Sequence, residues 1–531
     1  MREEPLSCRD CGAPSLAATG PVLPLLRVVL GLRTRVGENA LHGSPASLSP
    51  GEPTPAEVGS AFLAEGGLDD EASLQAVLNG TCAGVVTAKD APRAASIRAT
   101  ASTGAPMRGL RARPRVGVSF DARVLAHSPG VGPAPTPPAL LSQIHPERPD
   151  RVHVAVGWLA AVGLLQECVR IQSREATDAE ITLVAGETHR ARLESAVKSA
   201  ERLGGVLEGD TYINSNGTVL AARLALGSTI EAALACSRGV CDAAVVLTRP
   251  PGHHACAREF RGFCVYSNVA GAARAVLDDG ARRVLIIDWD VHHGDGTEEL
   301  LLNEPRALVI SVHRFGDFYP GTGRPSVVGG PSASARGRNV NVALRGDFFG
   351  DADYAAVLDA IIAPLARAFD PDLVLVSSGF DAARGDQLGD CDVTPAGYAA
   401  LTAGIIAAAP RAPVVVVLEG GYNLQSIGAS TEAVTRVLFG ERPIPLNAFD
   451  AETNMVAVSQ VLARDEDGED EAALNQNLRD ALEWEHGGET RDPSDVHPRR
   501  RIRPATWDAI LETRRAHTAY WPCFAGAARE T

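Results

Sequence analysis

The sequence lacks any run of about 18 consecutive apolar residues, the length that a helix needs to cross a bilayer. The 531 residues therefore predict no transmembrane helix. The apolar stretch 21–32 contains two prolines and an arginine, so it does not have the pattern of a clean signal peptide. The ten cysteines are irregularly spaced and do not suggest a disulfide framework, which favours a reducing compartment.

Positive charge is also in deficit. The chain has 50 Lys and Arg against 65 Asp and Glu, which gives a net charge of −15. This balance argues against a chain-wide role in binding nucleic acid or membrane surfaces. We expect a nuclear or cytoplasmic protein that makes no direct sequence-specific contact with nucleic acid. Organelle targeting is an alternative, because residues 91–119 hold six arginines and no acid, but Glu3 and Glu4 argue against a presequence.

Composition divides the chain into three parts. Residues 1–113 are rich in Ala, Gly, Pro, Ser and Thr, and we expect a disordered low-complexity extension there. Residues 114–445 are predicted to form one domain. Residues 446–531 form a C-terminal extension with an acidic loop at 465–471 and a closing amphipathic helix at 507–521.

The central part alternates between two kinds of segment. Short β-branched runs occur at 116–120, 181–186, 243–248, 283–288, 307–313, 372–381 and 413–422. Helical patterns rich in Ala and Leu occur between them at 221–238, 268–279, 352–369 and 395–409. Continuous apolar strands are typical of parallel sheets covered on both faces. The alternation predicts an α/β fold with a doubly wound, mostly parallel sheet flanked by helices.

One of these strands ends abruptly in polar residues. In VLIIDWDVHHGDGTEEL (284–300), Asp288, Asp290, His292, His293 and Asp295 crowd into eight positions. Carboxylates and imidazoles are costly to bury unless they are paired or bind a metal. The carboxyl ends of parallel strands are also where α/β proteins bind ligands. Three further strands end in polar motifs, so a single site at this edge of the sheet is expected.

Three of the polar residues suit a metal. Asp290 and His292 alternate along an extended segment and can point to the same side, and Asp381 ends a different strand at the same edge. Two carboxylates and one imidazole leave a fourth position for water, which is the pattern of a catalytic zinc site. Such a metal would lower the pKa of the water and polarise a carbonyl.

Two other motifs could supply acid–base and oxyanion chemistry. His253 and His254 follow two prolines and a glycine, and paired imidazoles near a metal can act as general base and acid. On its own, such a pair is equally compatible with a surface turn. Asp288 and Asp295 are the carboxylates available to orient them. Tyr422 follows two glycines and could donate to a developing oxyanion, or could be a core tyrosine at a strand end.

These motifs together resemble a known family. In order they are HPERPDRV (145–152), RPPGHHA (249–255), GFCVYSNVA (262–270), IIDWDVHHGDGT (286–297), SVHRFGDFYPGTG (311–323), NVNV (339–342), SSGFDAARGDQLGDCDVTPAGY (377–398) and LEGGYNL (418–424). They are similar to the zinc-dependent histone deacetylases, most of all to the class II branch. The resemblance covers residues 116–440 and implies the arginase–deacetylase fold.

The resemblance also implies roles for single residues. Asp290, His292 and Asp381 would bind one zinc ion, with His254 as the main proton shuttle and His253 as electrostatic support. Asp288 and Asp295 would be their carboxylate partners, and Tyr422 would bind the carbonyl. Gly262, Phe263 and Tyr319 would line the acetyl-lysine tunnel, and Asp210 would hold the substrate backbone. Asp288, Asp290, His292, Ser311 and Val312 match the family's inner potassium site.

The sequence departs from common family patterns at the tunnel rim. Leu388 stands where polyamine-preferring members carry an acid, which points to acetyl-lysine. Tyr422 is not the histidine of the weakly active animal branch, which favours catalysis. We therefore expect zinc-dependent hydrolysis of Nε-acetyl-lysine on histone tails or other proteins, with a corepressor complex as a further expectation. A non-catalytic acetyl-lysine-binding scaffold and a deacetylase of small acetylated amines are the alternatives.

Overall fold

The computed structural model describes residues 82, 84–90, 113–128, 145–443 and 502–524. The described residues contain a nine-stranded sheet in which every neighbouring pair of strands is parallel. The strand order is β1-β3-β2-β6-β11-β10-β7-β8-β9. Their bounds are β1 Val85–Val86, β2 Val116–Ser119, β3 Val169–Ile171, β6 Ala243–Val246, β7 Val284–Asp288, β8 Ala307–Phe315, β9 Asn339–Arg345, β10 Leu373–Ser378 and β11 Val414–Leu418.

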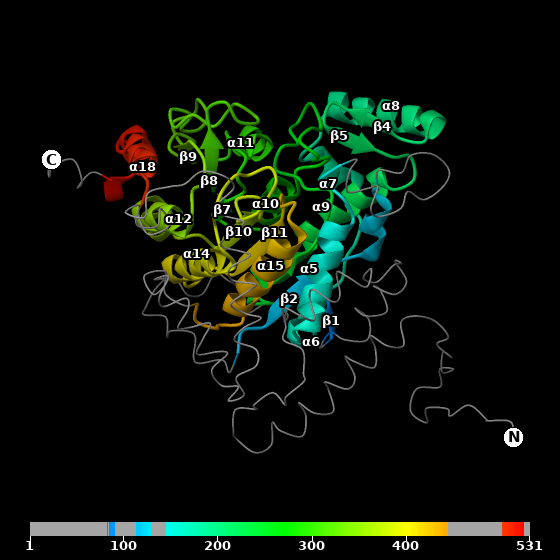
Figure 1. Cartoon of the computed structure of the whole chain (residues 1–531), viewed down its shortest axis with the longest axis horizontal. Helices are drawn as coiled ribbons and strands as arrows, with labels where there is room; N and C mark the ends of the chain where they lie inside the picture. The colour runs from blue at the N-terminus through cyan, green and yellow to red at the C-terminus, as the bar shows by residue number, and fades with distance from the viewer. Residues whose placement is uncertain (1–81, 83, 91–112, 129–144, 444–501, 525–531) are drawn as a thin grey trace, which may run out of the picture.

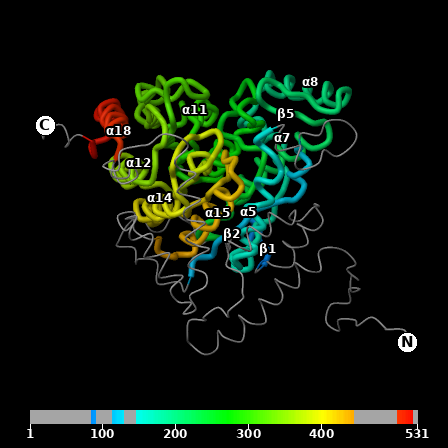
Figure 2. The backbone as a smooth tube through the Cα atoms, in the orientation of Figure 1, coloured from blue at the N-terminus to red at the C-terminus, as the bar shows by residue number. Residues whose placement is uncertain are grey.

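Helices cover both faces of the sheet, and each face has its own hydrophobic core. One core takes side chains from α5 (Asp150–Ala161), α6 (Leu164–Glu167), α12 (Asp351–Val357), α13 (Ala363–Phe369), α14 (Pro395–Ala408) and α15 (Leu424–Leu438). The other takes them mainly from α7 (Asp178–Thr182), α8 (Glu187–Leu203), α9 (Thr218–Ser237), α10 (Asn268–Asp278) and α11 (Asp295–Leu301). Helices α5 and α15 pack side by side on the same face of the sheet (Figure 1, Figure 2). The doubly wound parallel fold predicted from the sequence is confirmed.

Helix α9 is long and apolar enough to cross a membrane by length and composition alone. It has 20 residues, and 78% of its most apolar 18-residue window is buried inside the structure. It packs along α10 and against strands β2 and β6. The helix is therefore accounted for as a core helix of the α/β fold.

One predicted strand is wrong. The run 181–186 forms the end of helix α7 and the turn after it. Thr177 caps this helix by accepting from the backbone N–H of Glu180, while the Glu180 carboxylate accepts from the backbone N–H of Thr177. Arg174 holds the same carboxylate. This capping box starts a helix where the β-branched residues alone suggested a strand.

Two segments outside the predicted 114–445 domain pack onto it. Strand β1 pairs with β3 at one edge of the sheet, and the following backbone N–H of Ala88 donates to Glu231 on α9. Helix α18 (Pro504–His517) packs on β9 at the other edge of the sheet. It lies beside α12 at the left of Figure 1. This helix overlaps the one predicted at 507–521. The acidic run 465–471 and most of 1–113 lie outside the described residues.

The sheet order explains where the site forms. Strands β6, β11, β10 and β7 are consecutive neighbours. They are the four strands that end in the polar motifs at residues 249–254, 419–422, 379–381 and 288–295. Because all four strands are parallel, their carboxyl ends meet at one edge of the sheet.

Candidate active site

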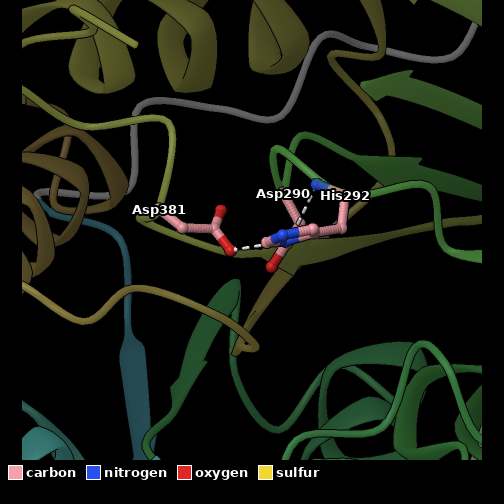
Figure 3. A group of neighbouring side chains, drawn as sticks. All are labelled: Asp290, His292 and Asp381. Atoms are coloured by element: carbon pink, nitrogen blue, oxygen red, sulfur yellow. Dashed lines mark hydrogen bonds and ion pairs between the residues drawn. The ribbon is translucent and has the colours of Figure 1, made fainter. Parts of the chain in front are cut away.

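A buried cluster of two carboxylates and one imidazole lies at this edge (Figure 3). Asp290 and His292 follow β7, and Asp381 follows β10. The Nδ1 atom of His292 lies 3.2 Å from an Asp290 oxygen and 3.1 Å from an Asp381 oxygen. The backbone N–H groups of His292 and Gly420 donate to Asp290, and that of Val291 donates to Asp381. The backbone therefore fixes both carboxylates beside the imidazole.

The geometry of this cluster fits a zinc ion. Four ligands placed tetrahedrally about 2.0 Å from zinc lie roughly 3.3 Å from one another, close to the two separations between His292 and the carboxylates, and all three ligand atoms lie within 4.8 Å of one another. Gly420 packs directly over the cluster, since a Cβ atom there would lie 2.2 Å from Asp381 and 2.5 Å from Asp290. Within the described residues, this is the group of acid, histidine or cysteine side chains that converges closely enough to hold a metal.

His253 is paired with a deeply buried carboxylate. Its Nδ1 atom lies 3.0 Å from Asp288, and its Nε2 atom lies 3.8 Å from Asp290. Burial lowers the pKa of His253, but the negative charges of Asp290 and Asp288 outweigh burial and hold the pKa well above its usual range. The Glu419 carboxylate accepts from the backbone N–H groups of Gly252 and His253, which fixes the loop that carries both histidines.

His254 is paired with the second predicted carboxylate. Its Nδ1 atom lies 2.7 Å from Asp295, and its ring packs against that of His253 with centroids 4.0 Å apart. Burial and the charge of His253 lower the pKa of His254 to about 4. The two neighbouring imidazoles therefore differ in their expected charge near neutral pH, because their surroundings differ.

Tyr422 is held from two sides. Its backbone N–H donates to the Asp386 carboxylate at 2.6 Å, and the same carboxylate accepts from the backbone N–H of Leu388 at 2.9 Å. On the other side, Arg151 donates to the carbonyl oxygens of Glu419 and Gly421. The Arg151 guanidinium also lies 5.2 Å from the centre of the Tyr422 ring. Burial raises the pKa of Tyr422 well above its usual value, so its hydroxyl remains a donor.

A buried ion-pair network connects the tandem-histidine loop and the Tyr422 loop. The Glu147 carboxylate accepts from Arg249, which opens the tandem-histidine loop, and from Arg151, which holds the Tyr422 loop. Burial raises the pKa of Glu147, but the two arginines outweigh burial and lower it to about 2. The sequence reasoning did not single out Glu147, Arg151, Asp386 or Glu419. All four lie inside the quoted motifs, so a search for charged residues flanking the catalytic ones could have found them.

A tight turn at residues 261–264 packs against the ring of His254. Gly262 and Phe263 both have positive φ, 58° and 65°, and the flanking Arg261 and Cys264 exchange backbone hydrogen bonds. Asp210 accepts from the backbone N–H of Gly262 at 2.8 Å. The predicted substrate-binding aspartate therefore also fixes this turn. A Cβ atom at position 262 would lie 2.4 Å from the His254 ring, so glycine is required by space as well as by φ.

Two further aromatic residues contact the imidazoles of the site. The Tyr319 ring meets the rings of His254 and His292 edge-on, at 5.0 and 6.1 Å, and the residue is 41% exposed. Phe318 stacks on His292 at 5.0 Å, a contact that the sequence did not predict. Leu388 is half-buried on the loop after Asp386. We call the predicted substrate-contacting residues Asp210, Tyr319 and Leu388 the rim, and Asp290, His292, Asp381, His253 and His254 the floor.

The predicted potassium residues lie side by side on two strands. Asp288 is the last residue of β7 and pairs in register with Ser311 of β8. Val312 is the next residue of β8 after Ser311. All three are buried. The Ser311 hydroxyl lies 2.9 Å from Nδ1 of His313. The structure thus brings the predicted set together, and its use as a cation site stays a prediction.

Comparison with known proteins identifies the family. The family model of the histone deacetylase domain matches residues 145–438, more than half of the chain. The crystal structure of the HDA15 HD domain superposes with a TM-score of 0.60 at 35% sequence identity, covering 78% of this chain and 96% of that one. The chain belongs to the histone deacetylase family, and the predicted class II-like membership is confirmed.

Several curated relatives share this domain. Histone deacetylase 15 of Arabidopsis thaliana is 41% identical over 351 residues, which are 65% of this chain and 61% of that protein. Histone deacetylase HDA1 of Candida albicans is 41% identical over 56% of this chain and 38% of its own length. Histone deacetylase clr3 of Schizosaccharomyces pombe is 37% identical over 62% and 48%. The chain covers less than two thirds of each of these relatives.

Proposed function

We propose that this protein hydrolyses Nε-acetyl-lysine side chains of histones or other proteins, with one zinc ion held by Asp290, His292 and Asp381. The observation that carries the proposal is the convergence of this metal cluster with two imidazole–carboxylate pairs and Tyr422 on four neighbouring strand ends. A scaffold that only bound acetyl-lysine would need none of the proton-transfer groups.

The metal and the protein divide the chemistry between them. Zinc, when bound, polarises an amide carbonyl and lowers the pKa of a water molecule. The protein contributes preorganised donors and acceptors. Asp290 and Asp381 are held by backbone N–H groups in the ligand arrangement, so little reorganisation is needed.

His254 is the residue proposed to move protons. Its low pKa leaves Nε2 able to accept a proton from the attacking water at neutral pH, and Asp295 fixes the ring through Nδ1. The same nitrogen would then deliver a proton to the departing lysine amine. His253 has a raised pKa and lies beside Asp288 and Asp290, which fits electrostatic support.

Tyr422 is proposed to donate its hydroxyl hydrogen to the oxyanion that forms from the substrate carbonyl. Asp386 and Arg151 hold the backbone on both sides of it. Phe263, whose ring lies 5.9 Å from that of Tyr422, and Tyr319 would flank the neutral acetyl-lysine stem. Asp210 would hold the substrate backbone, and Leu388 would favour acetyl-lysine over acetylated polyamines.

Other parts of the proposal follow from the family. Acetylated histone tails are the substrates that the relatives' names indicate. A structural potassium ion at Asp288, Ser311 and Val312, a nuclear or cytoplasmic location, and a corepressor complex complete the proposal.

The function is tested by measuring acetate release from acetyl-lysine peptides, together with zinc content by elemental analysis. The wild-type protein should hydrolyse the peptides with about one zinc per chain. Asp290→Ala should lose zinc and activity together, whereas Asp317→Ala, an exposed residue beyond β8, should keep both. Full zinc content in Asp290→Ala would contradict the ligand assignment. A zinc-loaded wild type without hydrolysis would contradict the activity.

A further inference from the structure

Arg261 spans both members of the His254–Asp295 pair. Its Nε–H donates to the backbone carbonyl of His254 at 3.4 Å, and its Nη2 atom donates to the Asp295 carboxylate. Asp295 uses its two oxygens separately, since Oδ1 lies 2.7 Å from Nδ1 of His254 while Oδ2 faces Arg261. Both ends of the carboxylate are therefore occupied, which sets its plane.

The position of Arg261 is itself fixed by the backbone. It opens the turn that ends at Cys264, with hydrogen bonds of 3.1 and 2.9 Å between the two residues. The tip of the turn is fastened by Asp210 and Thr211, which accept from the N–H groups of Gly262 and Phe263. The Arg261 guanidinium therefore extends from a turn that is fixed by hydrogen bonds and packed on the His254 ring.

The second imidazole pair has a different arrangement. The Asp288 oxygen that does not face His253 accepts from the backbone N–H of Asp290 at 3.1 Å. The backbone at the end of β7 therefore fixes the orientation of the Asp288 carboxylate. Asp295 instead begins helix α11, and the group that fixes its outer oxygen is a side chain from another loop. A side chain can be removed by mutation without altering the backbone, so the contribution can be measured.

An ion-pair chain continues outward from Arg261. Its Nη1 atom lies 3.3 Å from the Glu259 carboxylate, which lies 3.0 Å from the Arg192 guanidinium, and Arg192 in turn lies 3.8 Å from the Glu208 carboxylate. The side chains of Arg261, Glu259 and Arg192 are 36–40% exposed, whereas that of Asp295 is 6% exposed. Exposed pairs of this kind contribute little on their own. The link from Arg261 to buried Asp295 is therefore the one that matters.

We propose that Arg261 is a positioning residue for proton transfer, which orients Asp295 and through it the imidazole of His254. This inference rests on the proposed deacetylase function, because it assigns Arg261 to the same reaction. Without Arg261, Asp295 could rotate about its Cβ–Cγ bond and weaken the hydrogen bond that fixes the His254 ring. Ground-state binding of the substrate would not depend on this hydrogen bond.

Kinetics of four single variants test the proposal. Arg261→Met should lower kcat about tenfold and leave KM within twofold, and Arg261→Lys should restore part of the loss. Glu259→Gln should change kcat less than Arg261→Met does. Arg258→Met, an exposed arginine in the same loop, is the matched control and should behave as wild type. A kcat of Arg261→Met within twofold of wild type would overturn the proposal.

A double-mutant cycle separates positioning from general damage. In an Asp295→Asn background, Arg261→Met should change kcat by less than twofold, because the group through which it acts is already altered. Equal losses in both backgrounds would mean that Arg261 acts independently of Asp295, and would overturn the proposal.

A spectroscopic measurement separates this inference from the proposed activity. In protein labelled with ¹⁵N-histidine, the Nδ1–H proton signal of His254, assigned by its loss in His254→Ala, should shift or broaden in Arg261→Met and stay unchanged in Arg258→Met. If the signal responds but the wild type does not hydrolyse acetyl-lysine, the positioning role stands and the proposed function fails. An unchanged signal in Arg261→Met would refute the positioning role.

Discussion

The floor and the rim of the candidate site are built by different means. The floor residues lie on the short segments that follow β6, β7 and β10 and are almost fully buried, and the Asp290 and Asp381 carboxylates accept from the backbone N–H groups of Gly420 and Val291. The rim residues lie on loops, and Tyr319 is 41% exposed. The sheet geometry therefore determines the floor, whereas loop packing determines the rim. Changes to the floor should affect turnover, and changes to the rim should affect the choice of substrate.

The largest effect is expected at His254. Positioned acid–base groups typically contribute about 10²–10⁴ in rate. His254→Ala should lower kcat by this range while zinc content stays at the wild-type value. His253→Ala is the matched comparison and should cost less, since His253 is proposed to act electrostatically. A His254→Ala enzyme within tenfold of wild type would show that another group shuttles the proton.

Tyr422→Phe should give the next largest loss. The ring and its contacts with Phe263 and Arg151 remain, and one hydrogen bond to the transition state is removed. Loss of an oxyanion donor typically costs about 10²–10³ in kcat. Thermal unfolding should be unchanged. If steady-state kinetics showed a change in KM alone, Tyr422 would be a substrate-binding residue.

Asp386 links the Tyr422 loop to the rim, because its carboxylate accepts from the backbone N–H groups of both Tyr422 and Leu388. Asp386→Asn replaces one acceptor oxygen with an N–H donor, so one of these loops must move. We expect kcat to fall about tenfold, and KM to change as well, since the rim shifts too. Asp390→Asn, an exposed residue on the same loop, should leave both constants unchanged. Wild-type values of kcat and KM in Asp386→Asn would show that the Tyr422 loop and the rim do not depend on this carboxylate.

The smallest effect is expected at Leu388. A new carboxylate there would attract the remote cation of an acetylated polyamine, but an exposed ion pair contributes only about 0.2–1 kcal/mol. Leu388→Glu should therefore raise the ratio of kcat/KM for acetylpolyamine over acetyl-lysine peptide by about two- to fivefold. Leu388→Gln controls for size. A wild type that already prefers acetylpolyamine would contradict the proposed role of this position.

The same difference explains what the sequence could predict. Asp290, His292 and Asp381 were identifiable because apolar strands end abruptly in residues that are costly to bury. The run at 181–186 was misassigned, because the capping box of Thr177 and Glu180 outweighs the β-branched pattern. Strand β3 was missed because only three residues form it. The bonds from Arg261 to Asp295, from Tyr422 to Asp386 and from Arg249 to Glu147 join segments 34 to 102 residues apart, so the sequence marks these charged residues within the motifs but not their partners.

Helix α18 has a consequence for the solution behaviour of the protein. Among the described residues, strand β9 has a single neighbour in the sheet, so its outer side could pair with a strand of another molecule. The hydroxyl of Thr513 donates to the carbonyl of Asn341, and the Trp521 indole donates to the carbonyl of Gly337. Helix α18 and the residues that follow it therefore cover the outer side of β9 and the segment before it, and block the addition of another strand. A chain truncated before Pro504 should self-associate more strongly than the full chain, as measured by light scattering. Equal self-association of the two chains would show that the outer side of β9 does not pair with another molecule even when it is uncovered.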